Sequence, residues 1–162
     1  MMGRLGPWAV LIFVGLVGGA MVLFRQAVEV PSLLKPTDAS VVALGKQVYA
    51  NQCMVCHGDQ LQGQPNWQMR SPEGLLPAPP HDASGHTWHH PSAYLIEFVK
   101  RGPAQMVGNG YQSAMGGYAG VLTDDEIVAV LSYIKSTWSA RIQRAHNQID
   151  ERFYEAQNKA QN

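Results

Sequence analysis

The sequence CMVCH, at positions 53–57, decides how this chain of 162 residues is interpreted. Its two cysteines are the only cysteines in the sequence, so their spacing cannot belong to a disulfide framework and needs another chemical explanation. The preceding segment, residues 39–52, repeats apolar side chains at helical spacing behind Thr37 and Asp38, which are suitable N-caps. A helix is therefore expected to lead directly into Cys53.

The C-x-x-C-H spacing is that of covalent haem attachment. Cys53 and Cys56 can add to the two vinyl groups of one haem, and the adjacent His57 then brings an imidazole under the iron. A structural zinc site would need four ligands, and the chain has no second cysteine pair. A thioredoxin-like pair would follow a strand, and nothing before Cys53 indicates one. The sequence predicts one covalent haem c, with His57 as an iron ligand.

The haem face opposite His57 needs either a second ligand or an open site, and this choice separates electron transfer from ligand chemistry. Met115 is the preferred ligand because it lies in the glycine-rich stretch 102–122, whose backbone can approach a porphyrin closely. Met106, in the same stretch, is the second candidate. Ligation by a second histidine is the main alternative to methionine, and the candidates are His81, His86, His89 and His90.

Those four histidines fall within ten residues, a density that raises the question of a second metal. We prefer a polar loop whose histidines face water or bond to carbonyl groups. A partner for a haem propionate within this loop, together with the indole N–H of Trp88, is also compatible with the sequence.

Two further helices are predicted after the motif. Residues 57–90 are rich in Gly, Pro, Asn and His and are expected to be mostly loop, whereas 91–101 carry an apolar stripe that ends in basic residues and Gly-Pro. Residues 102–122 have no period and are expected to lack regular structure. A T-x-x-E capping box opens the third helix, 123–138, and the polar segment 139–162 can extend it as a helix.

An apolar run near the amino terminus predicts a membrane anchor. Residues 8–24 are uncharged and flanked by Arg4 and Arg25; as a helix they span about 26 Å, close to the ~30 Å hydrocarbon core. We expect residues 1–25 to be an anchor rather than a signal peptide, because cleavage at the available small-residue site would leave an apolar new terminus. Residues 26–37 contain two prolines and predict an extended tether.

Composition limits the classes of partner. Twelve basic and twelve acidic side chains give a net charge of zero, so no nucleic-acid partner is expected. Residues 38–138 suit one small domain, and a domain of that size often needs a cofactor to complete its core.

Over roughly residues 38–138 the chain resembles the class I c-type cytochromes of the bacterial monohaem type. Gly45, Tyr49 and the CMVCH motif lie in the order that this family uses. The resemblance implies a close crossing of the first and last helices, where Gly45 admits the ring of Tyr133. It also implies that Met115 is the axial methionine.

In this family a proline carbonyl holds the N–H of the haem-ligating imidazole, and Pro79 or Pro80 is the candidate here. The resemblance implies an all-α, cytochrome c-like domain of three main helices around one covalent haem. Together with the anchor, it implies a single-pass protein of the bacterial inner membrane whose haem domain faces the periplasm.

The function expected on these grounds is single-electron transfer in a respiratory or photosynthetic chain, with His57 and Met115 as ligands and no enzymatic activity of its own. The expected partners are the membrane and redox proteins that act as donor and acceptor, including a larger oxidoreductase complex. The alternative is a haem subunit, sensor or peroxidase whose sixth position is open or held by histidine.

Overall fold

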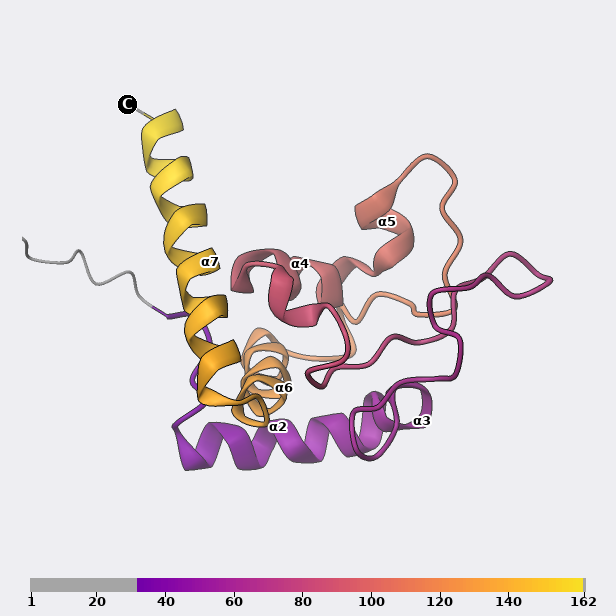
Figure 1. Ribbon diagram of the computed structural model, residues 1–162, viewed down its shortest axis with the longest axis horizontal. Helices are drawn as coiled ribbons and strands as arrows, with labels where there is room; N and C mark the ends of the chain where they lie inside the picture. Colours follow the sequence, from indigo (N-terminus) through magenta and orange to yellow (C-terminus); the bar gives the residue numbers. More distant parts are fainter. Residues whose placement is uncertain (1–31, 162) are drawn as a thin grey trace, which may run out of the picture.

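The computed structural model describes residues 32–161, which are helical and contain no strand (Figure 1). The elements are α2 (Ala39–Gln52), α3 (Met54–His57), η1 (Thr87–His89), α4 (Ser92–Arg101), α5 (Pro103–Val107), α6 (Asp124–Ser136) and α7 (Ala140–Ala160). The predicted anchor, residues 1–25, lies outside this range. Between residues 32 and 161, no helix is both long enough and apolar enough to cross a membrane.

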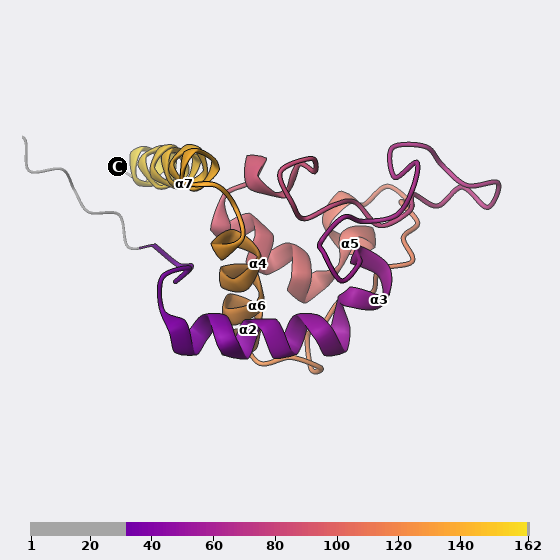
Figure 2. The same cartoon turned by 60° about the horizontal axis from the view of Figure 1, so that its bottom comes forward.

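The core of the domain is organised by the crossing of α2 and α6, which is the most extensive contact among the described elements. Figure 2 shows α6 crossing α2 steeply. At the crossing, any side chain on Gly45 would collide with the backbone carbonyl of Ala129 and approach Cβ of Tyr133. The ring of Tyr133 lies 5.5 Å from that of Tyr49. The predicted contact between Gly45 and Tyr133 is thus confirmed, and it places the end of α2, and so Cys53, at the edge of the core.

Local signals fix where these two helices begin. The Asp38 carboxylate accepts hydrogen bonds from the backbone N–H groups of Ser40 and Val41 at 3.0 and 3.2 Å, which caps α2. Thr123 and Glu126 form the predicted capping box of α6, each side chain accepting from the other residue's backbone N–H. Both helix starts were readable because their caps are adjacent in sequence to the apolar repeats.

Two segments differ from the sequence prediction. The stretch 102–122 was expected to lack regular structure, but it contains the short helix α5, which starts at Pro103. Gly102, with a φ of 78°, turns the chain just before it. A helix of five residues is too short to show a period. The chain also does not continue the third helix beyond Trp138: α6 ends at Ser136, and α7 is a separate helix behind an N-cap at Ser139.

The predicted tether, residues 26–37, is packed over its described end. Leu34 is 1% exposed within the core, and the backbone N–H of Lys35 donates to Oγ of Ser132 at 2.9 Å. The chain is therefore held against α6 before α2 begins.

Candidate haem site

The attachment motif sits where α2 turns into the short helix α3. Its histidine, His57, is 7% exposed, and Nδ1 donates a hydrogen bond of 2.8 Å to the carbonyl oxygen of Pro79. Of the two prolines predicted for this role, the structure selects Pro79. Because a carbonyl can only accept, this bond fixes the proton on Nδ1 and leaves Nε2 as the nitrogen for a metal.

The surroundings of His57 favour the neutral form of its imidazole. Burial lowers its pKa, and the hydrogen bond to Pro79 offsets this only in part. Neutral imidazole is the form that binds a metal. The hydrogen bond to Pro79 thus orients the ring, and burial favours the neutral form that ligation needs.

The two cysteines are free thiols: Cys53 is the N-cap residue of α3, and Cys56 lies within that helix. Cys53 is half-buried and packs against the core, whereas Cys56 is exposed. Burial, followed by the neighbouring Cys56, raises the pKa of Cys53 to about 11. No disulfide joins them, so both sulfurs are free for thioether bonds.

His81 lies beside His57 rather than across from it. The two rings stack face to face, with centroids 4.0 Å apart and planes inclined by 22°. Nδ1 of His81 is 2.8 Å from Oγ1 of Thr87, and the backbone carbonyl of His81 accepts from Nε1 of Trp138 at 2.8 Å. Because stacked rings leave no room for a porphyrin between them, this placement argues against His81 as the opposite ligand.

The other three histidines pack against aromatic side chains. His86 stacks on Trp67, His90 stacks on Tyr94, and His89 lies edge-on to Trp88; the ring centroids are 5.3, 5.1 and 3.8 Å apart. Among residues 32–161, no group of three His, Cys, Asp or Glu side chains is placed to hold a metal ion. His86 and His89 are exposed, as the predicted polar loop requires.

The loop that carries Met115 is tied to the attachment motif through Tyr118. The phenol of Tyr118 donates to the backbone carbonyl of Gln52 at 2.9 Å, one residue before Cys53. Burial, and then the nearby Cys53 and Cys56, raise the pKa of Tyr118. Met115, half-buried three residues earlier, therefore belongs to a loop that reaches the motif.

The same loop is also bonded to the end of α4. The backbone N–H groups of Tyr118 and Ala119 donate to the carbonyls of Val99 and Lys100, both at 3.0 Å. A side chain on Gly117 would come within 2.7 Å of the carbonyl of Lys100, so this position requires glycine. Gly116, next to Met115, has open space around it. Gly117 thus allows the loop to pack closely on α4, and Gly116 leaves open space beside Met115.

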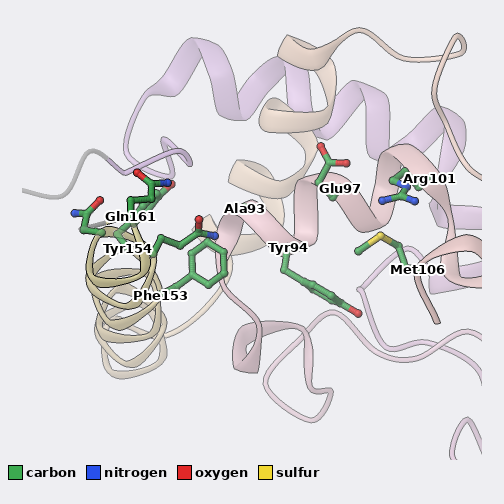
Figure 3. A pocket seen from close by; sticks show the side chains of 10 residues that line it. Ala93, Tyr94, Glu97, Arg101, Met106, Phe153, Tyr154 and Gln161 are labelled. Atoms are coloured by element: carbon green, nitrogen blue, oxygen red, sulfur yellow. The ribbon is translucent and has the colours of Figure 1, made fainter. Parts of the chain in front are cut away.

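Met106, the second candidate ligand, lies elsewhere. It projects from α5 into a groove of about 550 Å³ between α4 and the outer half of α7. In Figure 3, Met106 and Arg101 lie at one end of the groove, Phe153 at the other, and Tyr94 between them. No residue of the motif lines this groove, whereas the loop of Met115 is bonded through Tyr118 to Gln52 beside the motif.

Trp88 provides a test of whether the site suits a haem. Its indole N–H is buried and has no hydrogen-bond partner within the described chain, although the ring packs against the core. An indole N–H can only donate, and a buried donor without an acceptor is costly. A haem propionate would supply an acceptor. Two free thiols, the Nε2 of His57 and this unpaired donor together fit the cofactor that the motif implies.

Two comparisons with known proteins give matches. The family model described as Cytochrome c matches residues 42–138. Thiosulfate dehydrogenase of Stutzerimonas stutzeri (strain A1501) is 53% identical over 34 residues, which are 21% of this chain and 11% of that enzyme. No solved structure matches the chain. The family match includes the CMVCH motif and Met115 and ends at residue 138, before α7.

Proposed function

The chain belongs to the cytochrome c family, and from this membership we propose that it is a single-electron carrier with one haem c ligated by His57 and Met115. The family implies a covalently bound haem and haem-based electron transfer. The haem iron supplies a one-electron couple between Fe(II) and Fe(III), and no substrate bond is broken. The observation that carries the ligand assignment is the bond from Tyr118 to Gln52, which joins the Met115 loop to the motif.

Each residue of the site has a distinct role in this proposal. Cys53 and Cys56 hold the cofactor, while the Pro79 carbonyl orients the imidazole of His57. A thioether such as that of Met115 is a soft donor that favours the ferrous state, so ligation by histidine and methionine raises the reduction potential. A filled sixth position leaves no site for a substrate. The chain is therefore proposed to act as a carrier and not as an enzyme.

Carbon monoxide separates the carrier from its alternative. The ferric wild-type holoprotein should take up one electron per haem reversibly, and the ferrous form so produced should not bind carbon monoxide rapidly, because Met115 would occupy the sixth position. The measurement is the visible spectrum after mixing with the gas. Rapid binding would instead support a sensor or peroxidase with an open site.

We propose that residues 1–25 anchor the protein in the bacterial inner membrane, with the haem domain in the periplasm. The support is the apolar run 8–24 between Arg4 and Arg25. The full-length chain should therefore stay in the membrane pellet after alkaline washing. Its release into the wash, or a mature terminus near Met21, would favour a cleaved signal peptide.

The proposed partners are a donor and an acceptor of electrons at the membrane, either as free redox proteins or within a larger oxidoreductase complex. No nucleic acid is among them, since the chain has no net positive charge. Co-purification from membranes in mild detergent, followed by identification of what accompanies the haem, would name them. The similarity to thiosulfate dehydrogenase covers too little of that enzyme to bring its activity to this chain.

A further inference from the structure

The helix α7 lies beyond the segment that matches the family model, yet it buries polar side chains against the domain. His146 is completely buried and Asp150 is 6% exposed, one turn apart on the same face as Ile142. Figure 1 shows α7 standing at one end of the domain. A carboxylate is rarely buried unless it is paired, so the partners of Asp150 show what this helix does.

Asp150 caps a helix that it does not belong to. The helix α4 has no side-chain cap of its own, because its N-cap residue is Pro91. Instead, Oδ1 of Asp150 accepts from the backbone N–H of Ser92 at 2.6 Å, and Oδ2 accepts from the Ser92 hydroxyl at 2.7 Å. Two buried bonds to one carboxylate therefore fix the first residue of α4 to α7.

The carboxylate also faces one positively charged side chain and a histidine of its own helix. Nζ of Lys135, on α6, lies 4.0 Å from Oδ2 of Asp150 and donates to the Asn147 side chain at 2.7 Å. Nδ1 of His146 lies 3.6 Å from the same oxygen. These contacts join α4, α6 and α7 at a single buried point around Asp150.

The segment just before Ser92 leads to the haem site. It is η1, against which α7 packs, and it carries both Thr87 and Trp88. Thr87 bonds to His81, the ring that stacks on His57, and Trp88 presents the buried N–H without an acceptor. A shift of the start of α4 would therefore move one support of the iron-ligating imidazole and the donor proposed for a propionate.

We propose that Asp150 is a positioning residue of the haem site, through which the helix appended to the cytochrome c domain fixes η1 and the start of α4. This inference rests on the proposed function, because the positioned groups, His81 beside His57 and the indole of Trp88, serve a haem only if one is bound. It gives residues 139–162 a role that their polar, mixed-charge sequence does not show.

The test compares Asp150→Asn with Glu151→Gln, which removes the same charge from an exposed neighbour on the same helix. Loss of a negative charge alone raises the midpoint potential, because it disfavours the ferric state. Loss of positioning admits water to the haem surroundings and lowers the potential. We expect Asp150→Asn to lower the midpoint potential of the purified holoprotein, and Glu151→Gln to leave it unchanged or slightly raised.

A second readout follows Trp88 directly. Hydrogen exchange of its indole N–H, assigned by comparison with Trp88→Phe, should lose protection in Asp150→Asn while slow-exchanging amides at the α2 and α6 crossing keep theirs. Ser92→Ala removes the hydroxyl bond without changing any charge and should shift both readouts in the same direction by less. It also serves as the test if Asp150→Asn does not fold.

The outcomes separate this inference from the function on which it rests. A holoprotein whose potential and Trp88 protection are unchanged in both Asp150→Asn and Ser92→Ala would overturn the positioning role and leave electron transfer intact. Equal effects from Glu151→Gln would overturn it too. Absence of covalent haem from the wild-type chain would instead remove the proposed function itself.

Discussion

Changing Cys53 and Cys56 together to alanine should abolish covalent haem completely, while the wild-type chain should keep its haem through denaturation. Thioether bonds need no fold to persist, so a denaturing gel stained for haem measures the attachment directly. Each cysteine alone accounts for one bond, and the single variants should retain stain through the other. Loss of all stain from denatured wild-type protein would contradict covalent attachment.

The double variant should also destabilise the domain. A unit of about a hundred residues buries too little surface for a large stability margin, and a bound cofactor adds directly to the free energy of folding. In the wild-type structure Cys53 packs against the core, so an attached haem would extend that core from its edge. Helical circular dichroism on heating should show a lower midpoint for the double variant than for the wild-type holoprotein. The matched control is Met54→Ala, within the motif but without a thiol.

The sequence sufficed for the parts of the fold whose signals are local. The bounds of α2 and the start of α6 follow from apolar repeats with adjacent caps at Asp38 and Thr123. The separate helix α7 was harder to foresee because two of its buried residues are polar. His146 and Asp150 resemble surface positions until their packing is known, and Ser92, which Asp150 caps, lies 58 residues away in sequence.

The candidate site divides in the same way. The motif places Cys53, Cys56 and His57 next to one another by sequence alone. The choice of Pro79 over Pro80 depends on the path of a long loop, which no local pattern determines. The stacking of His81 on His57 likewise depends on the path of that loop. The loop is held there by the hydrogen bond from Trp138 to the His81 carbonyl, a long-range contact that no local pattern predicts.

Met115→Ala should convert the proposed carrier into a ligand-binding haem protein. The variant should lose the weak near-infrared absorption of sulfur-to-iron ligation that the family resemblance leads us to expect in the ferric wild type. Its midpoint potential should fall by about 0.1 V or more, within the ~0.8 V range that axial ligands span. The ferrous form should then bind carbon monoxide. These effects share one cause, the removal of a soft donor from the sixth position.

The matched control is Met106→Ala, which removes the same type of side chain from the groove beside α4 and α7 and should change none of the three readouts.

Tyr118→Phe provides an intermediate case. It removes the bond to the Gln52 carbonyl that ties the Met115 loop to the motif. The near-infrared band should therefore remain, but it should weaken at a lower temperature than in the wild type. If the band survives Met115→Ala and disappears in Met106→Ala, the ligand assignment is wrong. If the ferrous wild type already binds carbon monoxide rapidly, neither methionine fills the sixth position, and an open site takes the place of the carrier.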